Sequence, residues 1–229
     1  VFGHEIAKLD GLSMRNPSFG EKIIHRGRRA TLGFICGIFV CAISLSGCKR
    51  EDPISNKAVH WNSVDDVVLH GTLHGPTRFD DSGTPGFILL HSLGGIQTDW
   101  IGFCNRLSEE EFLSLSFDLR GHGESTTQGS TTIDYKRFTQ PDWSAMIQDV
   151  ALAKKSLLEA GADPDNIFII GSDLGANIGY KYAHGDNSIQ GVVLISPGLE
   201  YKRITLEEDM GDSASRRLPV LLIASEGDS

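Results

Sequence analysis

The chain has 229 residues, of which 40% are hydrophobic and 22% charged, so it is expected to fold around a core and not to be disordered. Its formal net charge of −9 repels the phosphates of nucleic acids, and we expect no nucleic-acid partner. Only Cys104 of the four cysteines lies beyond residue 48, which argues against a disulfide framework there. No zinc-ligand spacing, dinucleotide fingerprint or phosphate-binding loop occurs, so no metal or cofactor is expected.

The N-terminal segment has the layout of a secretory signal. Four basic residues within 22–29 precede an uncharged stretch at 30–47. The stretch leads into Leu45-Ser46-Gly47-Cys48, which resembles the lipobox of bacterial lipoproteins, whose cysteine carries the lipid and becomes the first mature residue. An uncleaved membrane anchor is the alternative, although the uncharged run is short for a spanning helix. Both interpretations predict an extracytoplasmic domain tethered to a membrane of the bacterial cell envelope.

These features divide the chain into three parts. Residues 1–47 are expected to form an N-terminal extension and signal peptide, in which Met14 is a sensible initiator. Residues 48–56 are polar and indicate a tether. Residues 57–229 are expected to form the main domain.

The main domain alternates short apolar runs with amphipathic segments, which predicts an α/β fold with a mostly parallel sheet flanked by helices. The first expected helix starts near Asp99 and carries Trp100, Phe103 and Leu107 on one face. The second has Asp142 as its N-cap and ends near residue 161, after which Asp163-Pro164 turns the chain. The expected strands are 58–61 and 67–70 as an antiparallel pair, then, after a turn region at 78–86, 87–91, 112–117, 166–170, 191–195 and 219–224.

The segment Gly171-Ser172-Asp173-Leu174-Gly175 lies between the expected strand 166–170 and a helix-like run at 176–184. This is the layout of a nucleophile elbow, a sharp strand-to-helix turn with glycines two residues before and after the reactive residue. The usual reactive residue is serine, and here it is Asp173. Ser172 is the rival nucleophile, but it is one residue out of register and should point away from the site.

Three segments together carry a family resemblance: His91-Ser92-Leu93-Gly94-Gly95 after one strand, residues 118–125 after the next, and the elbow after the third. The chain resembles the α/β-hydrolase superfamily over residues 58–229, closest to small bacterial esterases and to serine-aminopeptidase-like and dienelactone-hydrolase-like members. The resemblance implies the α/β-hydrolase fold, with the site at the carboxyl ends of the strands.

The resemblance also implies roles for single residues. The backbone N–H groups of Leu93 and Leu174 would form the oxyanion hole. Asp228 would be the acid that orients a catalytic histidine, with Glu226 as the alternative. That histidine is expected after one more strand and helix, so the sequence is interpreted as a fragment whose fold is incomplete at the C-terminus. We expect structural roles for His91 and for Asp118, Arg120 and His122 in the 118–125 loop.

Asp173 leaves two functions open. A carboxylate can attack carbon and form an ester intermediate, as in the related haloalkane dehalogenases and epoxide hydrolases. Those relatives often carry Trp after the Asp, where this chain has Leu174, and a helical cap in place of the short 196–218 segment. The sequence therefore predicts a membrane-anchored hydrolase acting on a small ester or related electrophile; the alternative is an inactive lipoprotein that binds a small molecule or a partner.

Overall fold

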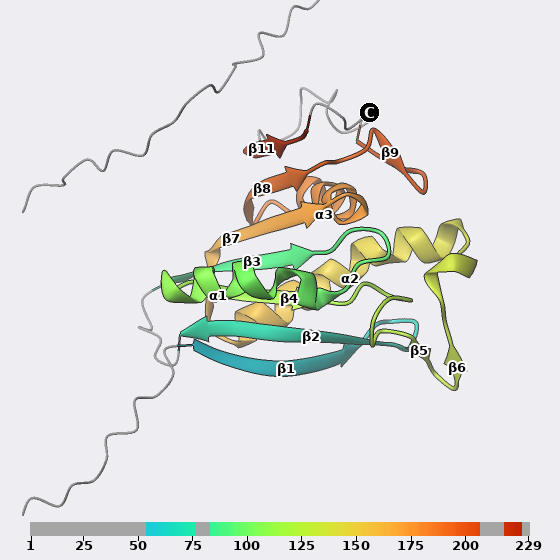
Figure 1. The fold of residues 1–229 in the computed structure, drawn as a ribbon, viewed down its shortest axis with the longest axis horizontal. Coiled ribbons are helices and arrows are strands. Elements are labelled where there is room, and N and C mark those ends of the chain that lie inside the picture. The colour runs from blue at the N-terminus through green and yellow to red at the C-terminus, as the bar shows by residue number, and fades with distance from the viewer. Residues whose placement is uncertain (1–53, 77–82, 207–217, 226–229) are drawn as a thin grey trace, which may run out of the picture. The chain divides into compact units, whose positions relative to one another are not determined.

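The computed structural model describes residues 54–76, 83–206 and 218–225, all within the unit formed by residues 48–229. Its centre is a mixed sheet in the order β11-β8-β7-β3-β4-β2, with β1 pairing to β2 (Figure 1). Pairing is parallel from β11 through β4 and antiparallel at β2, as the sequence predicted. The strands are β1 (Ile54–Asn62), β2 (Val67–Pro76), β3 (Thr84–Leu90), β4 (Leu113–Phe117), β7 (Ala162–Ser172), β8 (Ile189–Ile195) and β11 (Val220–Ile223).

Helices cover both faces of the sheet. Helix α1 (Ile101–Glu109) lies in front of it in Figure 1, whereas α2 (Gln140–Glu159) and α3 (Leu174–Gly185) lie behind. The rear face holds the apolar core, where Leu115 and Phe117 of β4 pack with Met146 of α2 and Ile178 of α3. The parallel strands all point toward the right of Figure 1, so their carboxyl ends share one edge.

The face of the sheet that α1 covers contains buried polar residues. Ser114 and Ser116 of β4 alternate with the core residues and are buried, and Ser116 Oγ lies 3.3 Å from Nε2 of the buried His74. Burial lowers the pKa of His74 to about 4, so it is neutral at physiological pH. On α1 the buried residues are Cys104 and Ser108, while Phe103 is 41% exposed. The ring centroids of Trp100 and Phe103 lie 6.2 Å apart, so these two residues share a face as expected.

Two boundary expectations are wrong. Helix α2 begins at Gln140 with Thr139 as its N-cap, and Asp142 instead closes a capping box by accepting the Thr139 N–H at 2.7 Å. Asp163-Pro164 does not turn the chain but lies inside β7, because Ala162 pairs with Thr84 across a register shift between the two strands. The pairing of Ala162 and Ile167 with β3 keeps the chain extended on both sides of these two turn-forming residues.

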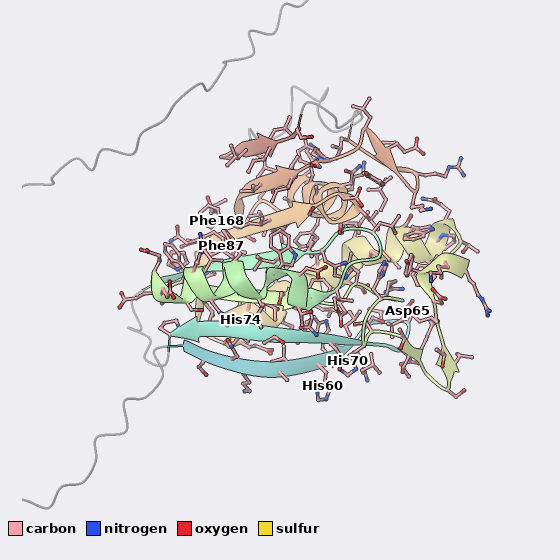
Figure 2. All side chains as sticks on the ribbon, viewed as in Figure 1. His60, Asp65, His70, His74, Phe87 and Phe168 are labelled. Carbon is pink, nitrogen blue, oxygen red and sulfur yellow. The ribbon has the colours of Figure 1, made fainter. Side chains whose placement is uncertain are left out.

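Aromatic and imidazole rings mark strand pairing on the sheet surface (Figure 2). Phe87 of β3 and Phe168 of β7 are register partners whose ring centroids lie 5.3 Å apart. His60 and His70 are register partners of β1 and β2, with ring centroids 6.1 Å apart. At the opposite edge, the side chains of β11 are all exposed.

Three short elements surround the carboxyl edge of the sheet. A small β-ribbon and a 3₁₀ turn, η2 (Tyr135–Arg137), occupy the 126–141 region that the sequence indicated as a loop. A hairpin follows β8, formed by β9 (Glu200–Tyr201) and β10 (Ile204–Thr205). The ribbon consists of β5 (Thr127–Gln128) and β6 (Thr131–Thr132), and a further 3₁₀ turn, η1 (Gln97–Trp100), precedes α1.

No helix in the described part of the chain is long and apolar enough to cross a membrane. The segment 30–47, for which a signal peptide or membrane anchor is expected, lies outside the described residues, as does Cys48.

Candidate active site

The strand-to-helix turn expected at Asp173 is present. Asp173 lies between the end of β7 and the first residue of α3, with φ 54° and ψ −121°, a conformation that non-glycine residues rarely adopt. Its N–H donates to the carbonyl of Ile195 at 2.9 Å, which ties the turn to β8. The strained backbone lifts the side chain of Asp173 to the carboxyl edge of the sheet.

The two glycines of the elbow are required by close backbone approach. A Cβ atom added at Gly171 would lie 2.3 Å from the carbonyl oxygen of Gly175, and one added at Gly175 would lie 2.5 Å from the carbonyl oxygens of Leu90 and His91. Neither obstacle is a flexible side chain, so neither can move aside cheaply. The turn can therefore form only with glycine at both positions.

We expect Gly171→Ala to destabilise the domain by about 2–4 kcal/mol, because the added methyl group overlaps backbone atoms. The matched control is Gly102→Ala in α1, where a Cβ meets nothing within 4 Å and should stabilise the helix by about 0.5–1 kcal/mol. Urea unfolding followed by circular dichroism measures both. Equal unfolding midpoints for the two variants would contradict the tight elbow.

The carboxylate of Asp173 is held by the loop after β3. Its Oδ2 accepts the backbone N–H of Leu93 at 3.0 Å, across 80 residues of sequence. Leu174 follows Asp173 as the first residue of α3, so its N–H has no intrahelical acceptor. The structure thus brings Asp173, Leu93 and Leu174 together, and one expected oxyanion donor already binds an oxygen of the expected nucleophile.

His91 has a structural role, as expected. It is 1% exposed, its Nδ1 lies 2.8 Å from the carbonyl of Ser92, and its Nε2 lies 2.9 Å from the N–H of Leu119. The first contact needs an N–H and the second needs a lone pair, which selects the neutral tautomer protonated on Nδ1. Burial lowers the pKa of His91, in keeping with this neutral form. Both ring nitrogens are committed, so His91 cannot act as the base.

Asp118 links the 118–125 loop to η1. It is 1% exposed, and its carboxylate accepts the N–H groups of Gln97 at 2.7 Å and of Glu124 at 2.9 Å. A Cβ at Gly123 would lie 2.2 Å from this carboxylate. The expected structural role of Asp118 is confirmed.

Arg120 forms a buried ion-pair cluster with two carboxylates. Its guanidinium binds Asp149 through Nε–Oδ2 at 2.6 Å and Nη2–Oδ1 at 2.7 Å, and binds Asp65 through Nη1 at 2.7 Å. The guanidinium holds the pKa of Asp65 below its ordinary value. The structural role of Arg120 is confirmed, but its partners were not predicted, because carboxylates 55 and 29 residues away leave no local sequence signal.

His122 also supports the loop. Its ring stacks on Tyr135 at 4.0 Å, and its Nδ1 lies 3.0 Å from the carbonyl of Arg120. Burial lowers its pKa to about 4. Tyr135 was not singled out from the sequence, yet its hydroxyl would lie 3.1 Å from a Cβ placed on Gly94, so η2 lies directly beside the 93–95 loop.

Residues 88–228, more than half of the chain, match the family model of serine aminopeptidase, S33. The chain belongs to this family. Its members are α/β hydrolases, and the observed sheet and flanking helices confirm the predicted fold class. Among curated proteins, none matches the sequence.

Solved structures resemble the fold at low sequence identity. A predicted CIB-like hydrolase from Thermoplasma acidophilum is 17% identical with a TM-score of 0.53, and the match covers 74% of this chain and 73% of that one. A thermostable carboxyl esterase from Bacillus coagulans is 18% identical with a TM-score of 0.49, over 62% of this chain and 44% of that one. An esterase from Pyrococcus furiosus is 23% identical with a TM-score of 0.49, over 63% and 53%. This chain thus spans about half the length of the two esterases.

The middle residue of the elbow is Asp173, so the turn presents a carboxylate and not a hydroxyl. The neighbouring Ser172 lines a separate hollow of about 180 Å³ with His91, Ser92, Asp99 and Trp100. Asp173 is not among the lining residues of this hollow. Asp228 and Glu226, the expected acids, lie outside the described residues.

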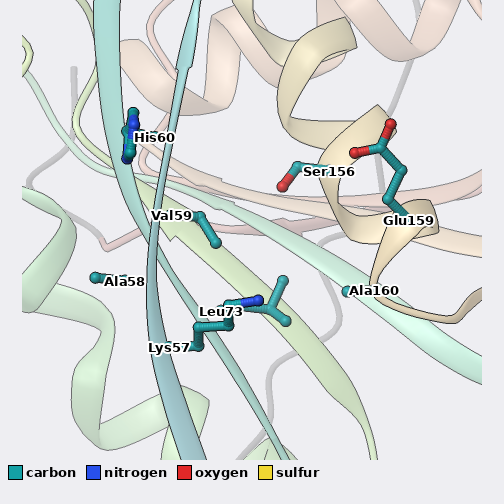
Figure 3. A pocket seen from close by; sticks show the side chains of 8 residues that line it. All are labelled: Lys57, Ala58, Val59, His60, Leu73, Ser156, Glu159 and Ala160. Atoms are coloured by element: carbon teal, nitrogen blue, oxygen red, sulfur yellow. The ribbon is translucent and has the colours of Figure 1, made fainter.

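A larger hollow of about 350 Å³ lies away from the elbow (Figure 3). It lies between β1 and the C-terminal end of α2, where α2 leads into the start of β7, whereas the elbow is at the end of β7. Its polar lining comes from surface residues, and it holds no hydrogen-bonded pair of nucleophile and base among the described contacts. The lining residues are Lys57, Ala58, Val59, His60, Leu73, Ser156, Glu159 and Ala160.

Proposed function

We propose that the protein is a hydrolase that uses Asp173 as its nucleophile on a small ester or related electrophile. The observation that carries this proposal is the placement of Asp173 at a strained elbow with Oδ2 bound to the Leu93 N–H. A carboxylate fixed through one oxygen leaves the other oxygen, Oδ1, to react. Membership of a hydrolase family supports the same reaction class.

The contact with Leu93 favours one kind of electrophile within this proposal. An ester substrate would need the oxyanion donors for its own carbonyl oxygen, but Asp173 occupies the Leu93 donor. A saturated carbon bearing a leaving group needs no such donor. In the first step Oδ1 forms a bond to that carbon, and the leaving group departs with the electron pair of the broken bond. The product is an alkyl ester of Asp173, with Oδ2 as its carbonyl oxygen.

The second step is hydrolysis of that ester. Water adds to the carboxyl carbon of Asp173, and the Leu93 N–H then stabilises the negative charge that develops on Oδ2. A base must take a proton from this water. His91 and His122 are held by the loop contacts described above, so we propose a histidine outside the described residues, oriented by Asp228 or by Glu226. Without that base the first step still proceeds and the ester persists.

Mass spectrometry tests the first step directly. The full chain is incubated with bromoacetamide, digested and mapped peptide by peptide. We expect the methylene carbon of the reagent to be attached to Asp173 as an ester, with bromide released. An absence of any adduct on the peptide that contains Asp173 would contradict the proposal and favour the alternative, an inactive protein that binds a ligand with this fold.

We also propose that the domain is held at a membrane of the bacterial cell envelope through lipid on Cys48, or through an uncleaved anchor at 30–47. The lipobox-like Leu45-Ser46-Gly47-Cys48 supports the first form. Growth with an alkyne-bearing fatty acid is expected to label the expressed protein, and Cys48→Ser should lose the label and leave the leader uncleaved. The control, Cys104→Ser, changes a buried thiol and should keep the label. Equal labelling of both variants would exclude Cys48 as the acceptor.

A further inference from the structure

Four basic side chains lie on two elements that are packed near the elbow. Lys136 and Arg137 belong to η2, which lies beside the 93–95 loop through Tyr135. Lys202 and Arg203 form the tip of the β9–β10 hairpin. All four are exposed.

The hairpin is fixed next to the nucleophile by Asn177 of α3. The Nδ2 of Asn177 donates to the carbonyls of Gly198 at 2.9 Å and Ile204 at 3.0 Å. Asn177 lies one helical turn after Asp173, to whose carbonyl its own N–H donates at 3.3 Å. The start and the second strand of this segment are therefore tied to the first turn of α3. At the tip, Lys202 Nζ lies 5.2 Å from the ring centre of Trp143 at the start of α2.

The hairpin tip holds its cations in an unfavourable conformation. Lys202 and Arg203 have φ angles of 51° and 63°, the left-handed region that favours Asn and Gly in two-residue hairpins. Glycine would form this turn without strain. Strained residues of this kind tend to gather at functional sites, which directs attention to their side chains.

These cations have no carboxylate partner among the residues that the structure describes. Among the described residues, no ion pair involves any of the four, whereas Arg120, Lys154 and Lys155 are all paired. The neighbouring Asp134 and Asp142 cap backbone N–H groups of Lys136 and Thr139, and Glu200 is the one further carboxylate on the hairpin strands. Residues 48–229 carry 15 Lys and Arg against 27 Asp and Glu, so the domain as a whole repels anions. The four cations are a local exception to this negative charge.

We propose that Lys136, Arg137, Lys202 and Arg203 form a basic rim that binds an anionic group, a carboxylate or phosphate, on the same small molecule that carries the electrophilic carbon. This inference rests on the proposed reaction of Asp173. The rim raises the local concentration of an anion beside Asp173, which the negative domain would otherwise repel. A neutral substrate gains nothing from it.

The test compares bromoacetate with bromoacetamide, which have the same leaving group and differ in charge. The rate of labelling at Asp173 is measured for each and divided by that reagent's rate with free acetate. We expect the corrected rate to be about 10-fold higher for bromoacetate, and Lys202→Gln combined with Arg203→Gln to remove this preference. Lys57→Gln with Arg106→Gln removes the same charge elsewhere and should keep the preference.

Each outcome bears on the rim separately from the nucleophile. Equal corrected rates for both reagents overturn the rim and leave the reaction of Asp173 intact. If neither reagent labels Asp173, the proposed function fails, and the rim is then tested by calorimetric binding of succinate. Weaker succinate binding to the Lys202→Gln, Arg203→Gln variant than to the parent supports the rim. Equal binding overturns it. A third outcome concerns the membrane. If the Lys202→Gln, Arg203→Gln variant no longer sediments with phosphatidylglycerol vesicles but keeps the preference for bromoacetate, these residues bind the membrane surface, and the proposal is overturned.

Discussion

Asp173→Asn is expected to reduce the rate of alkylation at residue 173 by at least about 10³-fold, because an amide is a far weaker nucleophile than a carboxylate. Asparagine is the closest isostere, and its carbonyl oxygen can still accept the Leu93 N–H at the position that Oδ2 holds now. The elbow should therefore keep its geometry, and the loss reports on chemistry. Time-resolved peptide mapping with bromoacetamide measures the rate.

The control for this variant is Asp134→Asn, which changes an exposed carboxylate that only caps η2. It should leave labelling at Asp173 unchanged. Equal loss in both variants would indicate a general effect of charge, and an unchanged rate in Asp173→Asn would show that the adduct forms elsewhere. Free energies of unfolding within about 0.5 kcal/mol of the parent confirm that the fold is retained.

Arg120→Met is expected to destabilise the domain by about 3–5 kcal/mol. The substitution leaves the carboxylate of Asp149, 1% exposed, buried without its counter-ion. It also releases Asp65, which links the loop before β2 to the 118–125 loop. Equilibrium urea unfolding measures the loss.

Lys155→Met provides the comparison. Lys155 pairs with Glu159 on the exposed face of α2, with both side chains more than two-thirds exposed, and such a pair contributes about 0.3–0.5 kcal/mol. If the two variants lose similar stability, the Arg120 cluster is solvated and does not hold the loop. If Arg120→Met with Asp149→Leu recovers part of the loss, the cause is the unpaired buried charge.

Much of the fold followed from local patterns. The continuous apolar run at 87–90 predicted a buried strand, and the glycines at 171 and 175 predicted the elbow whose close contacts require them. One error came where a distant partner overrode the local signal. Asp163-Pro164 has turn chemistry but lies inside β7, between Ala162 and Ile167, which both pair with β3.

The sequence by itself determined the order of the elements and the presence of a carboxylate at the elbow, because both depend on periodicity and on residues close together in the chain. The superfamily came from the resemblance of three short segments to known motifs. Only the tertiary structure decided what that carboxylate contacts. The Leu93 N–H reaches Asp173 across 80 residues, and Arg120 meets Asp65 across 55. Such contacts depend on the order in which strands pair, and hydrogen bonding between distant loops leaves no trace in local spacing.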